Sequence, residues 1–151
     1  MKGVRIFGIG SPSGDDQAGW LVVDALKAMG VDAFIDKLDR PGANLIPLLE
    51  NTSWVILIDA MQSGSPIACI RRFGSDAWPA YSHGLSSHGL GVIDALSLAR
   101  ELGSLPPRID LYGIEIGPLA QGTSAGDDVR AAARQLARRI AAELQESVQP
   151  Q

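Results

Sequence analysis

The feature that most constrains this chain is a glycine-rich turn near its start, residues 7–16, with the sequence FGIGSPSGDD. A short apolar run precedes the turn, and apolar residues at helical spacing follow it up to Met29. Its glycines permit backbone angles that a Cβ forbids, and Pro12 ends the extended segment. The stretch therefore predicts a strand-to-helix turn. It places two adjacent carboxylates, Asp15 and Asp16, where the helix dipole favours negative charge. One of them is expected to cap the helix, which leaves the other for chemistry.

Beyond this turn, extended and helical patterns alternate along the chain. Strands are predicted over residues 4–8, 32–38, 54–58, 67–73 and 108–116, and helices over 16–29, 43–50, 90–102 and 129–144. This alternation predicts a three-layer α/β/α sandwich with a mostly parallel, twisted, five-stranded sheet. The expected strand order is the flavodoxin-like or phosphorylase/hydrolase-like 2-1-3. We expect one domain over residues 1–146 and a polar tail over 147–151.

In the 2-1-3 order, the first and third strands are neighbours, and a ligand crevice opens at their carboxyl ends. The Asp15-Asp16 pair follows the first strand, and Asp59 closes the third strand after the apolar run 54–58. A carboxylate in such partly dry surroundings needs a proton, a cation or a metal as its partner. The alternative, that Asp59 only caps the corner at Ala60-Met61, remains equally open.

The chain has two histidines, His83 and His88, in the loop-like segment 74–89. The segment Ser86-Ser87-His88-Gly89-Leu90-Gly91 has the pattern of a helix entrance, with the serines as caps and His88 in the first turn. A lone loop histidine is more often simply solvated. Two carboxylates together with one histidine, however, suit a first-row divalent metal with open coordination positions.

The overall composition restricts the partners of the chain. A net charge of −4 and a pI of about 5.0 argue against nucleic acid or an anionic membrane as the main partner. The single cysteine, Cys69, excludes a disulfide framework or a cysteine zinc site and suits a reducing cytoplasm. No signal peptide is recognised, and no apolar run approaches the ~20 residues of a membrane-spanning helix.

These motifs together resemble those of the endopeptidases that mature nickel-iron hydrogenases. That family carries Gly-x-Gly-Asn-x-x-x-x-Asp-Asp/Glu near its N-terminus, Asp-Ala after its third strand, and a later Ser-x-His-x-x-Gly. The resemblance extends over nearly the whole chain, including the apolar strand end Ile114-Glu115-Ile116. The corresponding segments here are GIGS at 8–11, Asp15-Asp16, IDA at 58–60 and SSHGLG at 86–91.

The resemblance implies a function and a site. In the family, the second acidic residue of the pair, the Asp-Ala aspartate and the histidine bind a metal, which corresponds to Asp16, Asp59 and His88. The implied reaction is removal of a C-terminal extension from the hydrogenase large-subunit precursor after nickel insertion, with the substrate's nickel as recognition element. Zinc or cadmium can also occupy such a site. The resemblance leaves open whether the three residues activate water or only dock the metal. We expect a cytoplasmic monomer.

The chain departs from the family pattern at several loop positions. Ser11 replaces the family's asparagine, the loop to the aspartates is one residue shorter, and Gln17 stands where glycine is common. Residues 39–42, Asp-Arg-Pro-Gly, replace a frequent Asp-Gly-Gly-Thr. None of these changes removes a predicted ligand, so they bear on the identity of the substrate more than on the chemistry. The roles of Asp39 and His83 remain open.

Two alternatives come from other functional classes. A nucleotide-binding module is suggested by Gly8, Gly10 and Gly14, with an aspartate near the end of the second strand. The third glycine is one place late, however, and the Asp15-Asp16 pair would repel a pyrophosphate. A non-catalytic docking protein or chaperone for a metalloenzyme subunit would use the same metal ligands as a protease, so the sequence alone does not separate the two.

Overall fold

The structure, a computed structural model, describes residues 3–10, 17–39, 42–74, 87–117 and 126–148. Its strands are β1 (Val4–Gly10), β2 (Phe34–Asp39), β3 (Trp54–Met61), β4 (Ile70–Phe73) and β5 (Arg108–Glu115). Its helices are α1 (Ala18–Ala28), α2 (Ile46–Leu49) with the preceding 3-10 turn η2 (Gly42–Leu45), α4 (Ser87–Glu101) and α5 (Asp127–Val148). Among these described helices, none combines the length and apolar character that a bilayer-spanning helix needs.

The strands form one sheet in the order β2-β1-β3-β5-β4. All neighbouring pairs are parallel except β4 and β5, which are antiparallel. The predicted 2-1-3 order and the mostly parallel five-stranded sheet are therefore confirmed. The antiparallel strand is a short one at the edge, where the loop after β3 carries the chain over the end of β5 and back along it.

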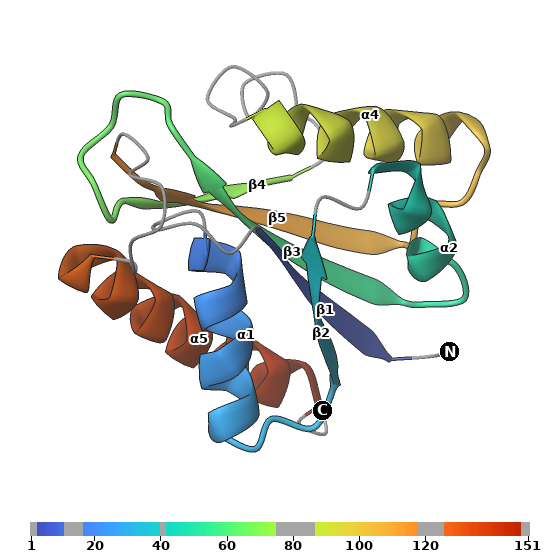
Figure 1. Cartoon of the computed structure of the whole chain (residues 1–151). Helices are drawn as coiled ribbons and strands as arrows, with labels where there is room; N and C mark the ends of the chain where they lie inside the picture. Colours follow the sequence, from blue (N-terminus) through green and yellow to red (C-terminus); the bar gives the residue numbers. More distant parts are fainter. Residues whose placement is uncertain (1–2, 11–16, 40–41, 75–86, 118–125, 149–151) are drawn as a thin grey trace.

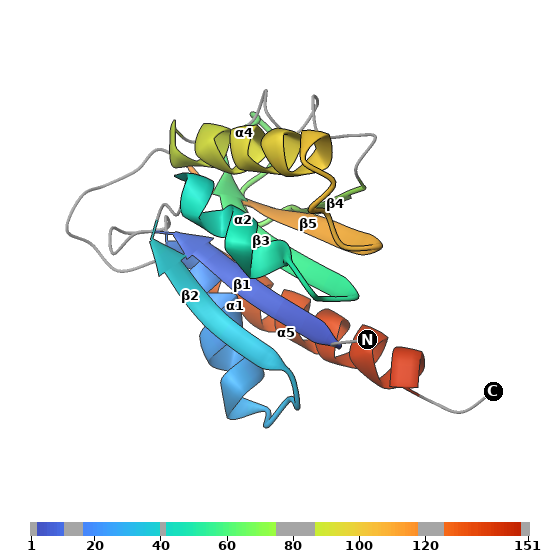
Figure 2. The same cartoon turned by 90° about the vertical axis from the view of Figure 1, so that its right-hand side faces the viewer.

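Helices cover both faces of the sheet, which confirms the three-layer sandwich. Figure 2 shows α2 and α4 above the sheet and α1 and α5 below it. Each interface has its own apolar cluster because side chains alternate between faces along each strand. The α1/α5 face buries Ile6, Ile56 and Ile58, while the α2/α4 face buries Phe7, Leu57 and Met61.

Two glycines let α1 lie directly against the sheet. A Cβ on Gly8 of β1 would lie 2.2 Å from the backbone oxygen of Gly19. A Cβ on Gly19 would lie 2.5 Å from the oxygen of Ile9 and 2.6 Å from the oxygen of Ile58. The first turn of α1 is thus in backbone contact with both β1 and β3, which only glycine permits at this distance.

Several elements differ in length from the sequence prediction. Strand β3 continues to Met61, so Asp59 lies inside the strand and does not cap a corner after it. The prediction of a strand end was wrong because the β3–β5 ladder continues to the pair Met61 and Glu115, which keeps the backbone extended through the aspartate. Helix α4 begins at Ser87, three residues earlier than predicted, and α5 runs on to Val148 through residues assigned to the polar tail.

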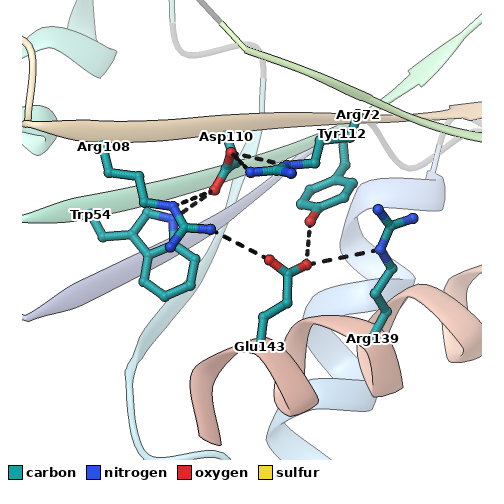
Figure 3. Close-up of polar contacts among 7 residues, drawn as sticks. All are labelled: Trp54, Arg72, Arg108, Asp110, Tyr112, Arg139 and Glu143. Atoms are coloured by element: carbon teal, nitrogen blue, oxygen red, sulfur yellow. Dashed lines mark hydrogen bonds and ion pairs between the residues drawn. The ribbon is translucent and has the colours of Figure 1, made fainter. Parts of the chain in front are cut away.

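Polar side chains connect α5 to the strands at the amino end of the sheet (Figure 3). Asp110 of β5, which is only 3% exposed, accepts a hydrogen bond of 2.8 Å from the indole N–H of Trp54. It also accepts hydrogen bonds from the guanidinium groups of Arg72, at 2.7 and 3.1 Å, and Arg108, at 3.1 Å. One buried carboxylate thus joins β3, β4 and β5 with cationic partners that offset its loss of hydration.

Glu143 of α5 completes this network. Its carboxylate accepts a hydrogen bond of 2.5 Å from the hydroxyl of Tyr112 and pairs with Arg108 at 3.5 Å and Arg139 at 3.9 Å. Burial, followed by this hydrogen bond, raises the pKa of Tyr112 well above its ordinary value. The network holds the second half of α5 against β5, at the opposite end of the sheet from the predicted crevice.

Candidate functional site

The candidate site lies at the edge of the sheet where β1, β3 and β5 end. Helices α1 and α4 both begin at this edge (Figure 1). The contact of Gly19 with the backbone of Ile9 and Ile58 fixes the start of α1 there. The edge therefore brings the end of β3, which carries Asp59, together with the starts of α1 and α4.

Asp59 is the predicted ligand whose side chain the structure describes. It is fully buried, and the other residues of β3 are all apolar. Its Oδ1 accepts a hydrogen bond of 2.8 Å from the amide of Ala60. Strand alternation places Asp59 on the same face as Leu57 and Met61, which is the face that α4 covers.

The backbone of His88 lies in the first turn of α4, as predicted. Val92, one helical turn later, is buried in the apolar cluster that also contains Leu57 and Met61 of β3. The helix that carries His88 therefore packs on the face toward which Asp59 points, and it begins at the edge where β3 ends. These two predicted ligands come from segments that the fold brings to one region.

The remaining sequence-predicted residues are placed less completely. Asp16, its neighbour Asp15 and His83 lie outside the described residues. Among the residues that the structure describes, no group of three or more His, Cys, Asp or Glu side chains has a metal-holding arrangement. Asp39 ends β2 in register with Gly10, so it lies at the same edge of the sheet, one strand further from β3.

One buried carboxylate at this edge was not singled out by sequence reasoning. Glu115 is the last residue of β5 and is 2% exposed. Its carboxylate accepts hydrogen bonds from the Ser63 amide at 2.8 Å, the Ser63 hydroxyl at 2.5 Å and the Gly64 amide at 3.3 Å. The sequence does contain a signal for this residue, namely a charged residue between two isoleucines at a predicted strand end. Treating Ile114-Glu115-Ile116 simply as an apolar strand end overlooks it.

Comparison with protein families decides the class of the chain. The family model for hydrogenase maturation proteases (HycI) matches residues 40–143. The chain belongs to the hydrogenase maturation protease family. The matched range contains Asp59 and His88, whereas Asp16 precedes it. A comparison with curated proteins finds no match.

Solved structures of hydrogenase maturation proteases share the fold. The endopeptidase HybD from Escherichia coli superposes with a TM-score of 0.82 at 24% identity, covering 98% of this chain and 94% of that one. HybD from Thermococcus kodakarensis superposes with a TM-score of 0.75 at 23% identity, covering 95% of this chain and 99% of that one. HycI from the same organism superposes with a TM-score of 0.70 at 24% identity, covering 95% of this chain and 92% of that one. Family members thus match this chain over nearly its full length in three dimensions.

The chemistry of the site follows from its donors. A carboxylate among apolar side chains favours a cationic partner, because a metal offsets the lost hydration of the charge. Carboxylate oxygen and imidazole nitrogen together suit borderline divalent metals such as nickel. The described part of the edge, Asp59 in β3 and the start of α4, is compatible with this donor set in a hydrogenase maturation protease.

Proposed function

We propose that this chain removes the C-terminal extension of a nickel-iron hydrogenase large-subunit precursor after nickel has been inserted. The observation that carries the proposal is the fully buried Asp59 at the carboxyl edge of a hydrogenase maturation protease fold, on the face covered by the helix that begins beside His88. The substrate's nickel is the recognition element in this proposal, and Asp16, Asp59 and His88 are its ligands. The protein works as a monomer in the cytoplasm, where Cys69 stays reduced.

The proposed reaction is hydrolysis of one peptide bond, in which a water adds across the bond and two chain ends are released. Three protein ligands leave coordination positions open for atoms of the substrate. The three residues then place the scissile bond at the sheet edge, a contribution of positioning. In the stronger version, one of the carboxylates also accepts the proton of the attacking water through an oxygen that does not bind the metal.

The deciding experiment is cleavage of a purified precursor. The protein is incubated with a nickel-loaded large-subunit precursor and, in parallel, with the same precursor lacking nickel. Loss of a C-terminal peptide, measured by mass spectrometry, is expected only with the nickel-loaded form. Binding of the loaded precursor without cleavage would instead identify a docking protein, and equal cleavage of both forms would contradict recognition through nickel.

A further inference from the structure

The residues that follow β3 form a loop that is tied to the end of β5. This β3–β4 loop comprises residues 62–69, and Figure 1 shows it extending beyond the sheet edge beside the end of β5. The Glu115 carboxylate accepts three hydrogen bonds from Ser63 and Gly64, two from amides and one from the hydroxyl. Hydrogen bonds to a charged acceptor are stronger than neutral ones, so this contact fixes the first turn of the loop.

Backbone hydrogen bonds fix the other end of the same loop. The Ala68 amide donates to the Glu115 carbonyl at 2.8 Å, and the Glu115 amide donates to the Cys69 carbonyl at 2.8 Å. The side-chain amide of Gln62 donates to the Gly117 carbonyl at 3.1 Å. Glu115 is therefore the residue to which both ends of the loop attach.

The loop lies beside the candidate site. It begins three residues after Asp59, and Met61 pairs with Glu115 as Asp59 pairs with Gly113. In neighbouring parallel strands, paired residues point to the same face, so the carboxylates of Asp59 and Glu115 lie on the face that α4 covers. One carboxylate belongs to the predicted ligand set, whereas the other holds the loop next to it.

The loop also presents an apolar side chain to solvent. Ile67 is 52% exposed, and its Cδ1 would lie 3.0 Å from a Cβ on Gly117. The close approach to Gly117 orients Ile67 where the chain leaves β5. An apolar side chain on a fixed loop next to a cleavage site can contact an extended apolar stretch of a bound polypeptide.

We propose that Glu115 is a positioning residue whose carboxylate fixes the β3–β4 loop as a wall beside Asp59, against which an extended apolar segment of the precursor binds through Ile67. This inference rests on the proposed precursor cleavage. Glu115 takes no part in bond breaking in this proposal, since both of its carboxylate oxygens accept hydrogen bonds from the loop. Its effect is therefore on the binding of the precursor and appears in KM more than in kcat.

Two substitutions separate positioning from chemistry. Glu115→Ala removes all three hydrogen bonds, and we expect KM for the nickel-loaded precursor to rise about tenfold with kcat little changed. Glu115→Gln can keep the three bonds, because its amide oxygen accepts from the two backbone amides and its amide nitrogen donates to the Ser63 hydroxyl. We expect Glu115→Gln to restore KM to within about threefold of wild type.

Amide hydrogen exchange on the protein alone measures the state of the loop. The Ser63 and Gly64 amides are expected to exchange faster in Glu115→Ala and at near wild-type rates in Glu115→Gln. If Glu115→Ala does not fold, Ser63→Ala carries the test, since at an exposed position it removes the hydroxyl donor to Glu115 and its contact with the Ser65 hydroxyl but keeps both amide donors. That variant is expected to raise KM about threefold.

A matched pair tests the contact residue. Ile67→Ala is expected to raise KM severalfold, whereas Leu98→Ala, which truncates a 47% exposed side chain near the far end of α4, leaves KM unchanged. A KM for Glu115→Gln as high as that of Glu115→Ala would overturn the positioning role, as would a wild-type KM in a Glu115→Ala protein whose loop amides exchange faster. A wild-type protein that cleaves no nickel-loaded precursor would overturn the proposed function itself, and with it this inference.

Discussion

At the scale of single residues, Asp59 is the most informative position. It is the one charged residue of a central strand whose other members are all apolar, and it is fully buried. Burying a charge is costly, so a carboxylate at such a place suggests a function that needs the charge. Asp110, a second buried aspartate, lies at the amino end of the sheet, where it pairs with Arg72 and Arg108 and joins strands of the fold.

The first prediction is that Asp59→Asn abolishes cleavage without unfolding the protein. The amide retains an oxygen that can accept the Ala60 hydrogen bond, while the charge that would bind a cation is lost. We expect precursor cleavage to fall at least about a hundredfold and circular dichroism to be unchanged. A folded Asp59→Asn protein that cleaves at a near wild-type rate would remove Asp59 from the site.

A second prediction concerns the other two proposed ligands. Asp16→Asn and His88→Ala are each expected to abolish cleavage with the fold retained. Asp15→Asn is the matched control and is expected to cost far less, because an asparagine still caps a helix. Precursor cleavage by the three variants decides this, and an equal loss in Asp15→Asn would show that the other member of the acidic pair is the ligand.

The sequence singled out the proposed ligands but not the proposed positioning residue. Asp59 and His88 stand out because each interrupts or borders a clear pattern in its own segment. The role of Glu115 depends on Ser63 and Gly64, which precede it by 52 and 51 residues. A contact between residues so far apart in the sequence leaves no pattern in the residues around Glu115. Long-range hydrogen bonds of this kind become visible only when the strand register is known.

At the scale of elements, the contact of α1 with the sheet determines the geometry of the edge. The glycine pattern predicted the turn after β1, but it did not predict that Gly8 and Gly19 would face each other across the helix–sheet interface. The length of β3 was misjudged for a related reason. A charged residue usually ends an apolar strand, whereas pairing with β5 here continues the strand past Asp59.

The third prediction is that Gly19→Ala is strongly destabilising. Its Cβ would meet backbone atoms of both β1 and β3, which cannot rotate away. We expect a loss of about 2–3 kcal/mol in the free energy of unfolding, the upper part of the range for overpacked interiors. Gly74→Ala is the control, since no atom lies within 4 Å of its Cβ, and it should be near neutral in urea unfolding. Equal stability of the two variants would contradict the close helix–sheet contact.

At the scale of the whole molecule, α5 is attached to the sheet through Tyr112 and Glu143. Burial and the hydrogen bond to Glu143 raise the pKa of Tyr112 above the ordinary value of about 10. Because the folded-state pKa is the higher one, this group's contribution to stability is fully present below about pH 10. It is then lost as the pH rises from there toward the folded-state pKa.

The fourth prediction follows from the raised pKa of Tyr112. Tyr112→Phe is expected to lower the free energy of unfolding by about 1–2 kcal/mol at pH 8, because the hydrogen bond to a carboxylate is lost. Above pH 10, the wild type should lose stability more steeply than the variant, so the difference between them shrinks. Urea unfolding of both proteins at pH 8, 10 and 11 measures this, and parallel curves would show that Tyr112 does not control the alkaline limit.

The two ends of the sheet differ in a way that matters for handling the protein. Val4 begins β1 and Val148 ends α5, and Glu143 of that helix contacts Arg108, the first residue of β5. Both outer ends of the described chain therefore lie at the edge opposite Asp59 (Figure 1). A tag or solid support attached through either end would leave the proposed cleavage edge facing the solution. The protein is thus suited to oriented immobilisation, which would let the proposed cleavage of the precursor be measured in flow.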